Sequence, residues 1–175
     1  RQQKPGDVVT AMNGKTIEID NTDAEGRLIL ADAICYAKSI GLTKLIDVAT
    51  LTGAISIALG DIRSGLFSNN DSLTLAVMTA SEATGERMWR MPLDPEYQDK
   101  IRSLVADVKN TGGRGAGSVT AARFLLTFVE ETPWVHIDIA GTSMIDSQRG
   151  YEPKGATGVP VRTIIETVVS LAKDT

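Results

Sequence analysis

The 175-residue sequence contains a single cysteine and a single histidine, and each scarcity excludes a class of site. Cys35 has no second cysteine in this chain to pair with, so we expect the fold to depend on its hydrophobic core, as in reduced intracellular proteins. Zinc sites built on histidines, including the H-E-x-x-H helix, need at least two imidazoles. Any metal ion bound by this chain is therefore expected to be held mainly by carboxylates.

Long apolar runs and blocks of positive charge are also missing. No apolar run reaches the roughly 20 residues that a membrane-spanning helix requires. The 18 Lys and Arg against 22 Asp and Glu give a net charge of −4, without the basic face that nucleic acid phosphates need. We expect a cytoplasmic protein that binds neither membrane nor nucleic acid. Its first residues, which lack Met and an apolar signal core, predict a piece of a longer polypeptide.

Apolar patterning predicts strands that alternate with helices. Asn13-Gly14 between Val8–Met12 and Lys15–Ile19 is typical of a β-hairpin with a type I′ turn. The segment that follows Asn21-Thr22-Asp23 and runs to Ile40 predicts a helix that is apolar nearly all round and so covered on several sides, with Gly41 just past its end. Further strands are expected at 44–49, 65–68 and 134–140, and further helices at 55–59, 72–84, 95–105, 118–131 and 161–172.

This alternation predicts an α/β fold with a mostly parallel sheet, covered by helices on both faces, behind an N-terminal β-hairpin. In such folds ligands bind at the carboxyl ends of the strands. The glycine-rich loop at 112–117 is compatible with anion binding by main-chain amides. It follows the polar Lys109-Asn110-Thr111 and not an apolar strand, so a tight loop that needs positive φ is the better interpretation.

The stretch Asn21-Thr-Asp-Ala-Glu-Gly-Arg27 carries the densest chemistry and has two interpretations. Thr22 and Glu25 have the spacing of a capping box, in which each side chain would satisfy a main-chain amide of the other. Against this, Gly26 costs a helix about 1 kcal/mol relative to Ala. Two carboxylates and a guanidinium beside a buried helix also need partners or metal ions.

The same stretch resembles the signature of the leucyl aminopeptidase family, the cytosol aminopeptidases with two metal ions. The resemblance covers nearly the whole chain in order. It continues through Leu28–Ala33, Asp47–Ala54, Asn110–Arg114, Thr120–Ala122, His136–Gly141 and Lys154–Gly158. It implies that residues 1–175 are the C-terminal portion of a metallo-aminopeptidase catalytic domain whose upstream part lies elsewhere.

The resemblance implies a role for each residue of the signature. Asp23 would ligate one of two divalent ions, Mn or Zn, and Glu25 would bridge both, with a bridging water attacking the scissile carbonyl. Arg27 would hold a bicarbonate ion that carries the proton to the leaving amine. Peptide substrates would be bound along Thr50, Leu51, Gly53, Ala140 and Ser143. At Ser143 the family often has a larger apolar residue, so the depth of the pocket stays open.

Three further ionisable residues lie inside predicted apolar strands. His136 would complete a Ser-His-Asp relay only if it were accessible, and a buried strand histidine is the better interpretation. Asp47 and Asp138 would be additional ligands or hydrogen-bonded structural groups, and we favour the second role.

The family's remaining ligands, a lysine and two aspartates, and a second catalytic lysine match no motif in this chain. Asp23 and Glu25 offer at most about four oxygens, whereas two such ions need roughly ten donor positions. We therefore expect the chain alone to bind metal weakly, to be inactive, and to leave an apolar helix face and a sheet edge uncovered. The resemblance implies a hexamer. The alternative is a non-catalytic α/β module that binds a small anion or serves assembly.

Overall fold

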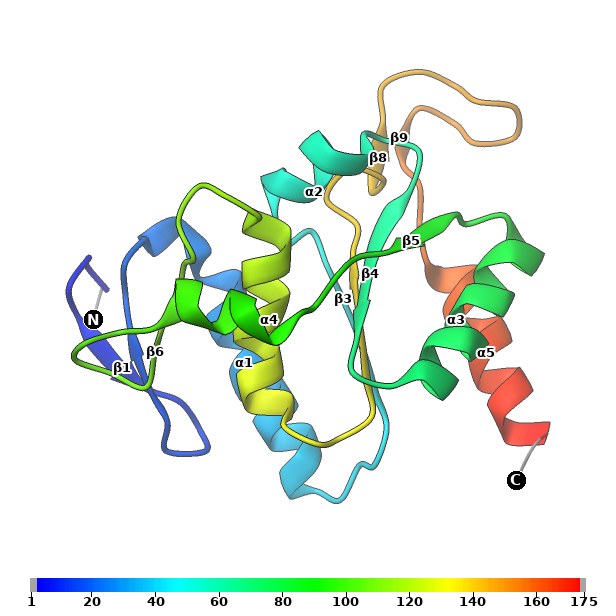
Figure 1. Cartoon of the computed structure of the whole chain (residues 1–175). Coiled ribbons are helices and arrows are strands. Elements are labelled where there is room, and N and C mark those ends of the chain that lie inside the picture. Colours follow the sequence, from blue (N-terminus) through cyan, green and yellow to red (C-terminus); the bar gives the residue numbers. More distant parts are fainter. Residues whose placement is uncertain (1–2, 174–175) are drawn as a thin grey trace. The chain divides into compact units, whose positions relative to one another are not determined.

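The computed structural model describes residues 3–173, which form two compact units (Figure 1). One unit runs up to Leu45 and includes Pro92–Trp134, and the other contains Ile46–Met91 and the chain from Val135 onwards. No helix in the described part of the chain is long and apolar enough to cross a membrane.

The first unit opens with the predicted hairpin. Strands β1 (Val8–Thr10) and β2 (Thr16–Glu18) pair antiparallel, and β2 pairs in parallel with β6 (Val108–Lys109). The turn is not type I′, which requires positive φ at two successive residues, because Gly14 has φ 87° and Asn13 does not have a positive φ. Gly14 N–H donates to Ala11 O, as in a type I turn followed by a left-handed glycine.

Two helices and two 3₁₀ segments complete this unit. The short η1 (Thr22–Ala24) leads into α1 (Gly26–Ser39), and Gly41 follows with φ 87° as predicted. Helix α1 packs against α4 (Gly117–Val129), which also contacts η2 (Pro95–Ile101). The predicted helix at 95–105 is therefore wrong in type and length, since Arg102 is already extended.

Helix α1 is less covered than its composition predicts. It buries Arg27, Ala31, Ile34 and Cys35, whereas Ile29 and Tyr36 are 67% and 57% exposed. One face of α1 is packed within the described chain, whereas apolar residues on another face are exposed to solvent. This agrees with the expectation that an apolar helix face is left uncovered.

The second unit is built on a four-stranded sheet in the order β3-β7-β4-β5. Its strands are β3 (Leu45–Ala49), β7 (Trp134–Asp138), β4 (Ser64–Ser68) and β5 (Met88–Arg90). Strand β4 runs parallel to β5 and antiparallel to β7. The sheets of both units are thus mixed, and the prediction of a mostly parallel sheet is not confirmed, because the sequence pattern of a buried strand does not encode the direction of its neighbour.

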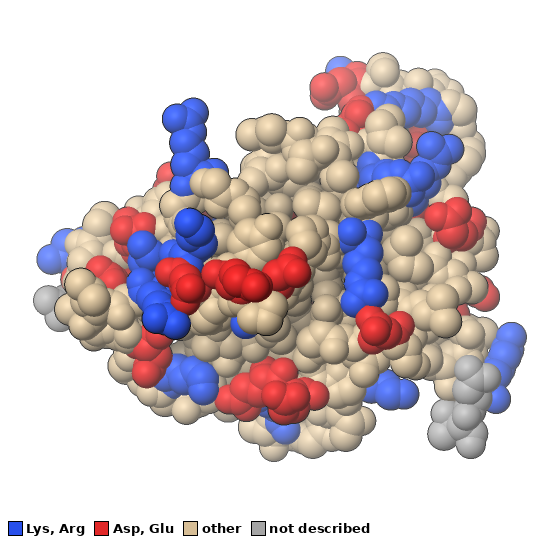
Figure 2. All heavy atoms as spheres, in the orientation of Figure 1, with Lys and Arg blue, Asp and Glu red and all other residues tan. Residues whose placement is uncertain are grey.

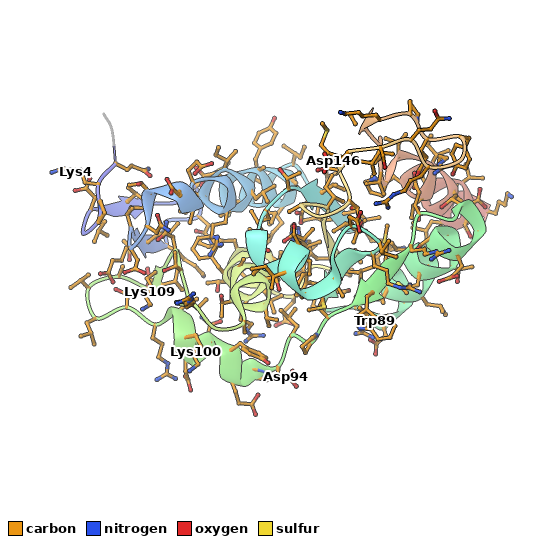
Figure 3. All side chains as sticks on the ribbon, turned by 90° about the horizontal axis from the view of Figure 1, so that it is seen from above. Lys4, Trp89, Asp94, Lys100, Lys109 and Asp146 are labelled. Carbon is orange, nitrogen blue, oxygen red and sulfur yellow. The ribbon has the colours of Figure 1, made fainter. Side chains whose placement is uncertain are left out.

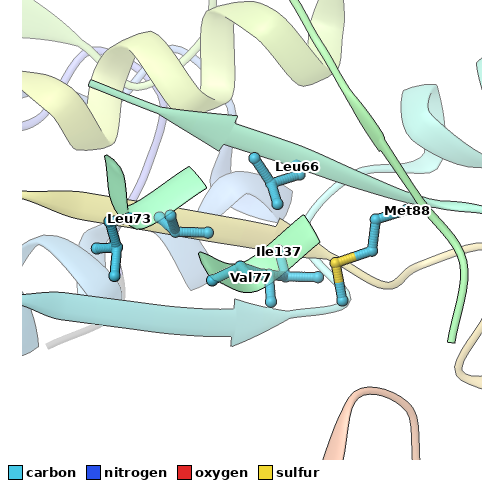
Figure 4. Packing of buried hydrophobic residues seen from close by; sticks show 6 residues of the cluster. Leu66, Leu73, Val77, Met88 and Ile137 are labelled. Atoms are coloured by element: carbon cyan, nitrogen blue, oxygen red, sulfur yellow. The ribbon is translucent and has the colours of Figure 1, made fainter. Parts of the chain in front are cut away.

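Helices α3 (Asp71–Thr84) and α5 (Val161–Lys173) lie beside each other in this unit. Leu73 and Val77 of α3 pack with Leu66, Met88, Val135 and Ile137 of the sheet to form its core (Figure 4). At the start of α5 the buried carboxylate of Glu86 accepts hydrogen bonds from the main chain and hydroxyl of Thr163, both 2.7 Å. The short α2 (Gly53–Leu59) follows β3, and β8 (Met144–Ile145) pairs with β9 (Gly155–Ala156).

Candidate functional site

The segment that carries the two candidate metal ligands is a 3₁₀ turn between β2 and α1. Asn21 is its N-cap, with extended backbone angles, and its Oδ1 accepts the main-chain N–H of Asp23 at 2.9 Å. Glu25 is the N-cap of α1 and makes no capping hydrogen bond through its side chain. The capping-box interpretation of Thr22 and Glu25 is therefore wrong, because Asn21 caps a separate turn upstream of the helix.

The carboxylates of Asp23 and Glu25 are both exposed. Neither accepts a hydrogen bond or forms an ion pair with any residue between 3 and 173. They stand two residues apart in sequence on a segment whose main chain is fixed by other groups. Carboxylate oxygens are hard donors that suit Mn²⁺ and are also used by Zn²⁺, so this pair fits part of a divalent metal site.

The side chain of Asn110 fixes the main chain just before Asp23. Its side chain is fully buried, and its Oδ1 accepts the main-chain N–H of Asp20 at 2.8 Å and of Asn21 at 3.2 Å. Its Nδ2 donates to the main-chain oxygen of Asn21 at 2.7 Å. Asn110 directly follows Lys109, the residue at the end of β6 that is labelled in Figure 3.

Arg27 lies in the first turn of α1 and is 9% exposed. Its Nη1 donates to the main-chain oxygen of Asn110 at 2.6 Å. The guanidinium is thus oriented by the residue that also holds Asn21, so Arg27 and the segment of Asp23 and Glu25 share one anchor.

The glycine-rich loop is a tight connection to α4, as predicted. Gly113 has φ 80°, which favours glycine. A Cβ on Gly112 would lie 2.5 Å from the Cβ of Thr120, so no larger residue fits there without displacing α4.

The candidate substrate-binding residues all lie in the second unit, on two turns that Asp138 joins. Thr52 caps α2, and its hydroxyl donates to Asp138 Oδ2 at 2.7 Å. Asp138 Oδ1 accepts the main-chain N–H of Leu51 at 3.0 Å and of Ala140 at 3.2 Å. The segment that contains Thr50 and Leu51 and leads into α2 at Gly53 is therefore tied to the turn after β7 that contains Ala140 and Ser143.

The two acids and the histidine have the structural roles that the sequence favours. Asp138 is 1% exposed and saturated with hydrogen bonds. Asp47 Oδ1 lies 2.6 Å from His136 Nδ1, and the imidazole is fully buried and stacks on Phe67. A buried ring in the middle of β7 is not placed to act on a substrate.

The candidate metal residues lie in the first unit and the candidate substrate residues in the second, and each set is assembled within its own unit. No group of three or more His, Cys, Asp or Glu residues that could hold a metal ion occurs within the described chain. A cavity of about 280 Å³ in the second unit is lined by other residues, Glu86 and Arg162 among them. On the face shown in Figure 2, Lys and Arg are interspersed with Asp and Glu.

Sequence reasoning missed the role of Asn110. The residue stands in a stretch that the family resemblance includes, but no local pattern assigns it a partner. The available signal was a polar stretch, Lys109-Asn110-Thr111, directly before a double glycine. Its bonds to residues about 90 positions away emerge only in the fold.

The profile of the cytosol aminopeptidase family, catalytic domain, matches residues 1–165 of the chain. The probable cytosol aminopeptidase of Solibacter usitatus is 57% identical over 164 residues, which are 94% of this chain and 34% of that protein. That of a Picosynechococcus species is 55% identical over 170 residues, 97% of this chain and 35% of the relative. The chain thus spans about a third of the length of these curated relatives.

Solved structures agree with the sequence matches. A mutant of tomato leucine aminopeptidase is 50% identical with a TM-score of 0.90, over 96% of this chain and 32% of that one. The bottromycin maturation enzyme BotP in complex with Mn is 41% identical with a TM-score of 0.92, over 97% of this chain and 38% of that one.

Proposed function

The chain belongs to the cytosol aminopeptidase family, and from that premise we propose that it is the C-terminal portion of a two-metal aminopeptidase that releases N-terminal residues such as leucine from peptides. The observation that carries this proposal is the pair of exposed carboxylates, Asp23 and Glu25, on a segment whose main chain is held by the side chains of Asn110 and Asn21. The two carboxylates are exposed and accept no hydrogen bond from a main-chain N–H, so they have no structural role within the described chain. Binding of a cation would explain why both are there.

Asp23 would ligate one divalent ion, Mn or Zn, and Glu25 would contribute to both ions of the pair. When bound, such ions supply Lewis acidity and activate water near neutral pH. The fit rests on donor chemistry, because two free carboxylates are oxygen donors that hard cations prefer. Relatives named for this activity and a similar structure that contains Mn support the assignment.

Arg27 would hold the bicarbonate ion and so place a proton carrier beside the reacting groups. Its Nη1 donates a hydrogen bond to the main-chain oxygen of Asn110, and this contact orients the guanidinium. A planar guanidinium is a fork of N–H groups whose geometry matches a carboxylate-like anion.

Thr50, Leu51, Gly53, Ala140 and Ser143 would form the wall against which the peptide lies. Asp138 supports this wall, because it joins the main chain of Leu51 to that of Ala140 through one buried carboxylate. Exposed main-chain groups in such a turn can align an extended peptide, while the side chains select its first residue.

The two carboxylates are an incomplete ligand set, and the chain is about a third as long as its curated relatives. We therefore propose that ligands outside these 175 residues complete the site and that the isolated chain does not turn over. A hexameric, cytoplasmic enzyme is the accompanying expectation, and the name of the relatives supports the compartment.

The test is made in the complete enzyme with Asp23→Ala and Glu25→Gln. Both variants should lose aminopeptidase activity on a leucyl peptide by at least about 100-fold, with an unchanged circular dichroism spectrum, since a metal ligand is removed and no buried contact is broken. Normal turnover by folded Glu25→Gln protein would contradict the proposal and favour the non-catalytic anion-binding or assembly module.

A further inference from the structure

The fully buried Asn110 directs all the described hydrogen bonds of its side chain at one short segment, Asp20 and Asn21. Lys109 pairs with Glu18 across the parallel β2–β6 ladder, and Asn110 N–H donates to Glu18 O at 3.0 Å. This register places the amide group directly beside the chain as it leaves β2.

From Asn110 a continuous series of hydrogen bonds runs to the main chain of Asp23, the first of the two candidate ligands. The main chain of Asn21 is held on both sides, its N–H by Asn110 Oδ1 and its oxygen by Asn110 Nδ2. The side chain of Asn21 then accepts the N–H of Asp23 at 2.9 Å. Every link uses neutral amides, so the segment is fixed without engaging either carboxylate.

Asparagine is the residue that this position requires. One oxygen accepts two N–H groups while the adjacent nitrogen donates to a carbonyl, and a terminal amide supplies both in one plane. Aspartate has the same shape but would place a second oxygen against the carbonyl of Asn21. Alanine would remove all three hydrogen bonds and leave these part-buried N–H and C=O groups without the Asn110 amide.

We propose that Asn110 is a positioning residue that sets the metal affinity of the Asp23–Glu25 segment by fixing its main chain before the metal arrives. This inference rests on the proposed function, because it takes Asp23 and Glu25 to be ligands. A prefixed segment loses little conformational freedom when its carboxylates bind, whereas a loosened one must be ordered by the metal itself. Groups that orient metal ligands typically contribute 10- to 100-fold to affinity.

The experiment measures the dissociation constant of Mn²⁺ by isothermal titration calorimetry in the complete enzyme. Asn110→Ala and Asn110→Asp should weaken Mn²⁺ binding by about 10-fold or more in the folded protein. If Asn110→Ala does not fold, Asn21→Ala removes only the last link, from an exposed position, and should weaken binding several-fold.

Asp107→Ala is the matched control. The Oδ2 atom of Asp107 accepts two 2.7 Å hydrogen bonds, from the N–H and the hydroxyl of Thr16, and so ties the same two strand segments together away from Asn21. This variant should lower thermal stability and leave the Mn²⁺ affinity within about twofold of wild type, since additive effects are expected for separate contacts.

Asp23→Ala separates the two claims. If it loses Mn²⁺ affinity while the Asn110 and Asn21 variants bind like wild type, the positioning role is wrong and the proposed function stands. If Asp23→Ala itself binds Mn²⁺ with wild-type affinity, the proposed function fails and the positioning role fails with it.

Discussion

Single polar residues in this protein act mainly by holding main-chain segments, and Asp138 is the clearest instance. Its carboxylate is almost fully buried and receives three main-chain N–H groups and one hydroxyl. From the sequence, an acid inside an apolar strand is also compatible with metal ligation, although a hydrogen-bonded structural role is favoured. The hydrogen bonds that its carboxylate accepts from Leu51 and Thr52 show the structural role.

Asp138→Ala should lower the free energy of unfolding by about 3 kcal/mol, because buried N–H groups lose a charged acceptor. Asp138→Asn should cost about 1 kcal/mol, since one oxygen remains. Urea denaturation measures both. Asp146, labelled in Figure 3, is an exposed acid of the same unit, and Asp146→Ala should change stability by no more than about 0.5 kcal/mol. Equal effects at the two positions would contradict the buried anchor.

At the scale of elements, the end of α4 is fixed by groups that the local sequence does not reveal. The end of α4 is tied to α1 and to the hairpin through Glu130, whose carboxylate contacts Lys38 Nζ at 2.7 Å and Lys15 Nζ at 3.2 Å. Glu130 itself has φ 58°, an unusual conformation for a residue with a side chain. Long-range ion pairs hold this turn, and no helix-end motif predicts them.

Hydrogen bonds from Lys38 and Lys15 hold the pKa of Glu130 below its ordinary value of 4.5. A lowered pKa means that the folded state favours the carboxylate, so this stabilisation is present above the ordinary value and is lost as the pH falls through the lowered one. Lys38→Met should therefore show a shallower loss of stability between about pH 6 and about pH 3 than the wild type.

Lys44→Met is the control for that series, because Lys44 is exposed and forms no ion pair or hydrogen bond within residues 3–173. It removes the same charge without touching Glu130. Thermal denaturation at each pH gives the comparison, and identical acid profiles for the two variants would show that the Glu130 contacts do not contribute.

At the scale of the whole molecule, the chain spans about a third of the length of its curated relatives. Apolar residues such as Ile29 and Tyr36 of α1 are exposed, and two carboxylates cannot satisfy two divalent ions. We predict that the isolated chain binds Mn²⁺ with a dissociation constant of roughly 1 mM, as expected for few ligands. Calorimetry with an Asp23→Ala control measures it, and micromolar binding at two sites would refute the ligand count.

The sequence by itself determined which segments are helices or strands wherever apolar patterning is strong, as in α1, α3, α4, α5, β3, β4 and β7, and it determined the family through the Asn21–Arg27 signature. These features are local, since a helix or a motif is encoded within a few successive residues. Only the tertiary structure decided that β4 and β7 run antiparallel and that Asn21, not Thr22, caps the segment of Asp23. It also decided that Asn110 holds the segment of the candidate metal ligands and that Asp138 holds the candidate substrate-binding residues. Three of these features depend on strand direction or on groups 70 to 90 residues apart in the sequence. Packing and the need to satisfy buried polar groups select such contacts, and no short stretch of sequence contains both partners.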